Sequence, residues 1–305
     1  SRWILINEDM FKEAGLDIPY DGWTYSEFLA DAEKLTHGEG QDKVYGVCWA
    51  RKQSGKSILY ALDGVLGANQ IYKNEEGTEV NFDNDVYRAG LNLVKETLDK
   101  GYAIPIEDEF SEDISVANTF LQGKCAIMLG VAQMRLCMDQ ENYPHDFMTA
   151  LVPAPVPDDE KYNTEFYRKQ IGTTGAGDLL SISANTKDPE ASFEFAMWYL
   201  KGGMSPLVQG GRIPLWNGVN KDEVLSVLKE KAQGSIDMDS MENYLSLDTT
   251  QGVAAIKGNA SSEISSAWFE EFDAMCYGKQ SVDQTVQNME KRGNELIQTE
   301  LSSQK

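Results

Sequence analysis

The chain opens with an alternation of short apolar runs and helical segments, and this pattern constrains the fold more than any other feature. Residues 5–36 read LINEDMFKEAGLDIPYDGWTYSEFLADAEKLT. Trp3–Ile6 is a candidate apolar strand, and Glu8–Ala14 predicts a short helix that ends at Gly15. Strands that alternate with helices in this way predict an α/β fold with a largely parallel sheet.

The second helix carries its own start signal. Thr24 can cap its first turn, and Glu27 can reach back to the backbone of Thr24, which together form a capping box. Trp23 precedes the cap and Phe28 occupies the fourth helical position, the spacing of a hydrophobic staple. We therefore interpret Trp23 as a structural clip rather than as a surface for ligand binding.

The same alternation continues along the chain. Further strands are predicted at Val44–Trp49, Cys125–Leu129, Phe147–Val152 and Leu179–Ile182. Helices are predicted at Ser57–Leu66, around Val86–Leu98, around Val116–Leu121, after the cap and proline Asp188-Pro189, and from a cap at Ser281 to about Leu301. Two segments rich in proline or glycine, near residues 153–172 and 202–217, indicate crossings between parts of the fold.

Charge excludes several classes of partner. The 305-residue chain carries a formal net charge of −22, which repels phosphate backbones and anionic lipid surfaces. The densest basic group, Arg51, Lys52 and Lys56, is small. No apolar run is long enough to span a bilayer. We therefore expect neither nucleic acid nor a membrane surface as a direct partner.

Cysteine and histidine usage argues against a metal centre. Cys48, Cys125, Cys137 and Cys276 contain no CxxC pair, and the only histidines are His37 and His145. Tetrahedral zinc sites usually need closely spaced ligand pairs. We expect no metal, no cofactor and buried free thiols, with one disulfide as the alternative.

Sequence signatures of catalysis are missing. There is no GxSxG, P-loop or HExxH motif. GTTGAG at residues 172–177 precedes a predicted strand, whereas dinucleotide-binding loops follow a strand and open a helix. Adjacent carboxylates are plentiful in so acidic a chain, and a glycosidase pair among them is the enzymatic alternative. We expect a protein without enzymatic activity.

Tryptophans on predicted loops suggest a different chemistry. Trp49 follows a strand and Trp216 lies in a proline-containing crossing. Flat aromatic faces beside hydrogen-bonding groups hold neutral polar rings such as sugars, although core packing is an equal alternative for both residues. Trp198 and Trp268 lie within helical apolar stripes and are predicted to be core residues.

The opening stretch resembles the signature of family 1 extracellular solute-binding proteins of ABC importers, a maltose-binding-protein-like group. Three later stretches are similar to further motifs of that family, in the same order. They are ANTFLQGKCAIMLG, LLSISANTKDPEASFEFAMWYL and YGKQSVDQTVQNMEKRGNELI. The resemblance covers essentially the whole chain.

This resemblance implies a type II periplasmic-binding-protein-like α/β fold, with two lobes of mixed sheets and flanking helices that close on a ligand. Family members usually carry further residues before this signature, so we expect the first lobe to be incomplete and the usual N-terminal portion to be lacking. Residues 1–170 would form the second, C-terminal lobe, and residues 171–210 a returning segment of the first, N-terminal lobe. Residues 211–305 would form the helical portion of the second lobe.

The resemblance also places a ligand-binding wall between the lobes. By position, it would draw on loops after two strands and on the crossings, hence on Trp49, Arg51, Ser54, Gln133, Arg135, Asp178, Arg212 and Trp216. Arginines in an acidic protein hint at an anionic sugar, because guanidinium groups suit carboxylates. Pairing of either arginine with one of the many acidic residues is the alternative.

The function implied is that of an extracytoplasmic solute-binding component of an ABC importer, which binds a sugar or oligosaccharide and delivers it to membrane permease subunits. Its location would be extracellular or periplasmic, with membrane attachment only through an N-terminal lipid anchor that these residues do not include. An extracytoplasmic sensor or interaction module is the alternative function, and a glycan-degrading enzyme is the least favoured.

Overall fold

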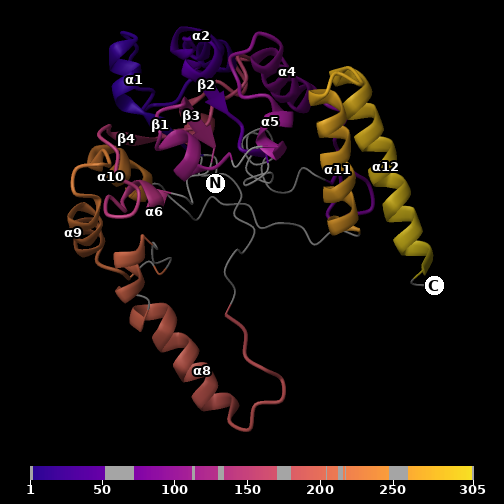
Figure 1. Cartoon of the computed structure of the whole chain (residues 1–305). Helices are drawn as coiled ribbons and strands as arrows, with labels where there is room; N and C mark the ends of the chain where they lie inside the picture. The colour runs from indigo at the N-terminus through magenta and orange to yellow at the C-terminus, as the bar shows by residue number, and fades with distance from the viewer. Residues whose placement is uncertain are drawn as a thin grey trace.

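The structure is a computed structural model that describes residues 3–51, 72–111, 114–129, 134–169, 180–203, 205–211, 216, 218–246 and 260–303. Within these ranges, helices surround a four-stranded sheet, and helix α8 (Pro189–Trp198) extends away from it (Figure 1). The helix predicted at Ser57–Leu66 lies outside the described residues.

The sheet is mixed rather than largely parallel. Its strands are β1 (Trp3–Asn7), β2 (Tyr45–Cys48), β3 (Cys125–Leu129) and β4 (Thr149–Pro153), in the order β2-β3-β1-β4. β2 and β3 run parallel, whereas β1 is antiparallel to both of its neighbours, with Ile4 opposite Leu129 and Val152. The prediction from alternation was wrong because a helix between two strands does not determine which strands pair. The mixed sheet implied by the family resemblance is confirmed.

The local signals at the start of the chain are confirmed. Asn7 caps α1 (Glu8–Glu13), where its side-chain oxygen accepts the backbone N–H of Met10. Thr24 and Glu27 form the capping box of α2 (Tyr25–Leu35). The Trp23 and Phe28 rings meet edge to face with centroids 5.0 Å apart.

The remaining helices cover the sheet and complete the core. They are α4 (Asp85–Asp99), α5 (Ile106–Ser111), α6 (Met134–Cys137), α7 (Glu165–Arg168), α9 (Lys221–Ala232), α10 (Met238–Ser246), α11 (Ser261–Cys276) and α12 (Val282–Ser303), with a π-helical turn at Val116–Phe120. Ser281 accepts the N–H of Gln284 at the start of α12, as predicted. Trp268 is 1% exposed, which confirms its core prediction.

Helix α8 differs from the others because its apolar side chains are exposed. Asp188 caps it and Pro189 opens it, as predicted. Phe193, Phe195 and Trp198 are nevertheless 58%, 60% and 60% exposed. The core prediction for Trp198 was therefore wrong, because α8 packs among the described residues mainly against the turn Tyr199–Gly203 that follows it.

The strand predicted at Leu179–Ile182 is also not formed over its described part. Leu180 and Ile182 have no regular secondary structure, and they are 45% and 39% exposed. An apolar run becomes a strand only when a neighbouring strand completes its backbone hydrogen bonds. No described strand pairs with these residues.

A buried carboxylate joins the two C-terminal helices. Glu271 on α11 accepts hydrogen bonds from Arg292 and Asn288 on α12 at 2.6 and 2.9 Å, and from Gln280 at 2.9 Å. Burial alone would raise the pKa of Glu271, but these three donors favour the ionised form and hold the pKa below its ordinary value of 4.5.

We predict that Glu271→Gln lowers the free energy of unfolding at neutral pH by about 1–2 kcal/mol, because Arg292 loses its buried carboxylate. A lowered pKa stabilises the fold above the unfolded value, and this contribution is lost as the pH falls through the folded value. Urea unfolding should therefore show the largest gap between parent and variant above about pH 5, and the gap should close toward about pH 3.

Glu270→Gln is the matched control, since Glu270 also contacts Arg292 but its side chain is 67% exposed. Its effect should stay within about 0.5 kcal/mol. A gap for Glu271→Gln that does not change with pH would contradict the prediction.

Candidate functional site

Three parallel segments end at one edge of the sheet. β2 and β3 run in the same direction, and residues 102–104 pair with β2 in that direction through bonds of Val47 to Tyr102 and Ile104, each 3.0 Å. β2 then leads to Arg51, and the 102–104 segment leads to α5. In open α/β sheets ligands bind beyond the carboxyl ends of the strands. We call this region the carboxyl edge.

At the carboxyl edge Arg51 forms a two-pronged ion pair. Its Nε and Nη2 atoms donate to the two carboxylate oxygens of Asp273 on α11 at 2.7 and 2.8 Å. The guanidinium also lies 4.1 Å from the ring centroid of Phe269 and 5.6 Å from that of Phe110. The Arg51 side chain is 14% exposed. The alternative in which this arginine pairs with an acidic residue is therefore confirmed, and its charge is already matched.

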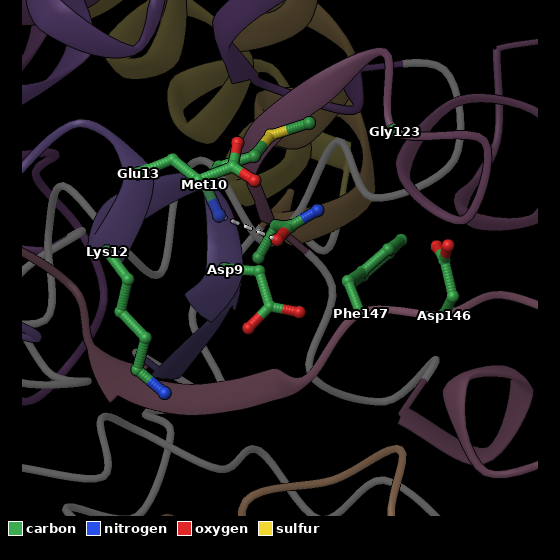
Figure 2. Close-up of a pocket in the computed structure, with 8 residues that line it drawn as sticks. Asp9, Met10, Lys12, Glu13, Gly123, Asp146 and Phe147 are labelled. Atoms are coloured by element: carbon green, nitrogen blue, oxygen red, sulfur yellow. Dashed lines mark hydrogen bonds between the residues drawn. The ribbon is translucent and has the colours of Figure 1, made fainter.

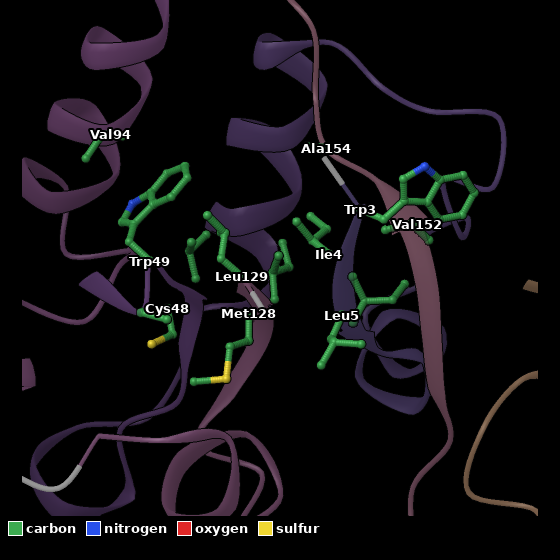
Figure 3. Close-up of a cluster of buried hydrophobic side chains, with 14 of the residues drawn as sticks. Trp3, Ile4, Leu5, Cys48, Trp49, Val94, Met128, Leu129, Val152 and Ala154 are labelled. Carbon is green, nitrogen blue, oxygen red and sulfur yellow. The ribbon is translucent and has the colours of Figure 1, made fainter. Parts of the chain in front are cut away.

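Trp49 lies in the core rather than along an open wall. It is 2% exposed, its indole N–H donates to the Thr97 hydroxyl at 2.9 Å, and its ring lies 5.7 Å from that of Phe28. Figure 3 shows it among apolar side chains that include Leu129. These contacts are those of the core-packing alternative, and they leave Trp49 no face for a ligand.

Arg135 and Trp216 are the other predicted wall residues that the structure describes. Arg135 is exposed on α6. A Cβ at Gly211, whose φ is +76°, would lie 2.9 Å from the Cβ of Arg135, so the crossing passes directly over α6. Trp216, further along that crossing, is 42% exposed. Ser54, Gln133, Asp178 and Arg212 lie outside the described residues, and their roles stay predictions.

Sequence reasoning missed Phe110, which is 43% exposed at the carboxyl edge. It stands in the acidic run EDEFSED, which reads as a solvated surface. The signal in the sequence was an aromatic residue within a polar segment after Pro105. Placing that residue at the carboxyl edge required knowing that residues 102–104 run parallel to β2.

A cavity of about 500 Å³ lies at the opposite edge (Figure 2). Its lining residues are Asn7, Asp9, Met10, Lys12, Glu13, Gly123, Asp146 and Phe147. They lie where β1 ends and just before β3 and β4 begin. The Asp9 carboxylate already accepts the N–H of Met148 at 3.2 Å. None of the residues that line the cavity is one of the predicted wall residues.

The cysteines match the expectation of free thiols. Cys48, Cys125 and Cys137 are buried, Cys276 is partly buried, and none is in a disulfide. Among the described ranges, no group of three or more His, Cys, Asp or Glu side chains is arranged to hold a metal ion. Within the same ranges, no helix is both long and apolar enough to cross a membrane.

Comparison with known families decides the classification. The sequence profile of the bacterial extracellular solute-binding protein family matches residues 1–201. The chain belongs to this family. No curated protein matches this solute-binding protein closely enough to count as a relative.

Solved structures share the fold of this solute-binding protein at low sequence identity. A substrate-binding protein from Listeria monocytogenes in complex with cycloalternan matches with a TM-score of 0.68 and 16% identity, over 97% of this chain and 69% of that one. The sugar-binding protein MalE from Xanthomonas citri matches with a TM-score of 0.68 and 16% identity, over 98% of this chain and 69% of that one. A solute-binding protein from Agrobacterium vitis with bound D-mannitol matches with a TM-score of 0.62 and 19% identity, over 99% of this chain and 70% of that one. The fold is thus the type II periplasmic-binding-protein fold.

We predict that Trp49→Ala lowers the free energy of unfolding by about 3–5 kcal/mol, because it opens a cavity in the core and leaves the Thr97 hydroxyl without its indole partner. Urea unfolding followed by circular dichroism measures the loss. Trp216→Ala is the control, and its exposed side chain should cost less than about 0.5 kcal/mol. Parent-like stability of Trp49→Ala would show that the indole is not a core residue.

A double-mutant cycle of Arg51→Met and Asp273→Leu should give a coupling energy of about 1–3 kcal/mol, because a two-pronged and mostly buried ion pair is stronger than an exposed one. The same cycle on Glu96 and Lys100, whose side chains are 45% and 46% exposed, should give less than about 0.5 kcal/mol. Equal couplings for the two pairs would refute the structural role of Arg51.

Proposed function

We propose that this solute-binding protein binds a sugar or oligosaccharide outside the cytoplasm and delivers it, chemically unchanged, to the permease of an ABC importer. The observation that carries the proposal is the carboxyl edge of a solute-binding-protein fold, where parallel segments present Arg51 and Phe110 together. Structural neighbours whose ligands are cycloalternan and D-mannitol support a carbohydrate.

The proposal includes a division into lobes. Residues 1–170 and 211–305 would form one lobe, because the sheet and helices α9 to α12 contribute to one hydrophobic core. Residues 171–210 would belong to the other lobe. The extension of α8 away from the sheet supports this for the α8 part (Figure 1), whereas Val208 packs in the same core as the sheet. The ligand would be held between the two, with hinge movement at the crossings.

An extracytoplasmic sensor or interaction module is the second candidate. The observation that favours it is the exposed apolar set on α8, Phe193, Phe195 and Trp198. Apolar patches of this kind mark contact surfaces for other polypeptides. A protein of this class would bind its partner without being stabilised by sugars.

The protein encoded by the complete gene should be stabilised by at least one member of a panel of mono- and oligosaccharides in thermal unfolding. A ligand at a hundred times its dissociation constant adds about 2.7 kcal/mol to the free energy of unfolding. Mass spectrometry of the recovered sugar should show no change in mass. A cleaved product, or stabilisation by a protein partner and by no sugar, would contradict the proposal.

A further inference from the structure

The cavity beyond the end of β1 is lined by carboxylates that have few partners. Asp9, Glu13 and Asp146 line it. Neither Glu13 nor Asp146 forms a hydrogen bond or an ion pair with any described residue. Lys12, which also lines the cavity, pairs with the Glu8 carboxylate at 2.6 Å. The cavity therefore carries negative charge that the described part of the chain does not neutralise.

A buried amide also lines the cavity, and half of it has no partner. Asn7 is 2% exposed and belongs to the lining. Its side-chain oxygen accepts the backbone N–H of Met10, whereas its amide nitrogen donates to no described residue. A buried donor without an acceptor is costly, and it is normally satisfied by water or by a ligand. The Asn7 amide thus offers a hydrogen bond to an oxygen atom of a bound molecule.

An aromatic ring forms another part of the lining. Phe147 packs edge to face on the buried Phe120, with ring centroids 5.5 Å apart, so its position is fixed by the core. In the view of Figure 2 the Phe147 ring lies between the carboxylates of Asp9 and Asp146. A cation near an aromatic face is attracted by the electrons of the ring. The ring and the carboxylates therefore attract the same kind of ligand, a cation.

The spread of the carboxylates favours an organic cation over a metal ion. Oxygen ligands of Mg²⁺ or Ca²⁺ converge to about 2.0–2.6 Å from one point. In the part of the chain that the structure describes, no three His, Cys, Asp or Glu side chains are arranged in this way. The cavity has a volume of about 500 Å³, which is within the range of small-molecule sites. A molecule of that size can reach both the carboxylates and the Asn7 amide.

We propose that this cavity is a binding site for a small organic ammonium ion that carries hydroxyl groups, such as an amino sugar. The ammonium group is attracted by the carboxylates of Asp9, Glu13 and Asp146. It lies against the Phe147 ring, and a hydroxyl oxygen of the ligand accepts the N–H of the Asn7 amide. The inference does not depend on the proposed function, because none of these residues belongs to the predicted ligand wall.

The test is titration calorimetry on the protein encoded by the complete gene, with D-glucosamine and D-glucose as probes. These two sugars differ by an ammonium group in place of one hydroxyl. Any neutral sugar that stabilises the protein is kept at saturation, so that its own site is filled during both titrations. Glucosamine should then bind at least about tenfold more tightly than glucose, and added salt should weaken its binding.

Variants of the lining show whether the binding takes place in the cavity. Glu13→Gln combined with Asp146→Asn removes two exposed charges and should weaken glucosamine binding about tenfold. Phe147→Leu keeps an apolar side chain without the ring and should weaken it about threefold. Glu263→Gln is the matched control, an exposed carboxylate on α11, which lies well apart from α1 in Figure 1. Its affinity should equal that of the parent, and circular dichroism confirms that each variant is folded.

Three results would overturn the inference. They are no binding of glucosamine, equal affinity for glucose and glucosamine, and glucosamine binding that the double variant leaves unchanged. Mg²⁺ is titrated alone as a further probe. Mg²⁺ binding that is lost in the double variant and that displaces glucosamine would assign the cavity to a metal ion instead. The proposed function is decided separately, by the panel of sugars in thermal unfolding.

Discussion

Burial of both faces of the sheet is the constraint on which the rest of this structure depends. Every residue of β1, β3 and β4 is buried, so helices must cover the sheet on each side. In open α/β sheets covered on both faces, ligands bind beyond the ends of the strands. The parallel pairing of β2, β3 and residues 102–104 makes one edge the meeting point of several chain segments. The other edge, beyond the end of β1, holds a cavity whose lining includes Asp9, Glu13 and Asp146 together with Lys12.

Sequence patterns predicted the parts of the fold that local chemistry decides. The capping box at Thr24, the Trp23–Phe28 contact and the strand Cys125–Leu129 depend on neighbouring residues, and all were found as predicted. Strand direction was not predictable from alternation, because pairing is decided by burial across the whole sheet. The exposure of Trp198 was not predictable either, because a helix has the same apolar stripe in its sequence whether or not another element packs against it.

The candidate site shows the same division between local and distant information. Arg51 and Trp49 were placed correctly at the end of a strand, but their partners Asp273 and Thr97 lie far away in the chain. Those partners decide that Trp49 packs in the core and that the charge of Arg51 is matched. Residue spacing in a sequence can indicate which residues lie at the carboxyl edge of the sheet. It cannot indicate which of their side chains already pair with residues distant in the chain.

An exposed phenylalanine on its own needs no explanation, because single apolar side chains are common on protein surfaces. Phe110 differs because Arg51 and Glu109 connect its helix to the end of β2, and because a mostly buried Arg–Asp pair matches the charge beside it. Here the Arg51–Asp273 pair lies beside the Phe110 ring at the carboxyl edge, so a matched charge pair and an exposed apolar side chain share one surface.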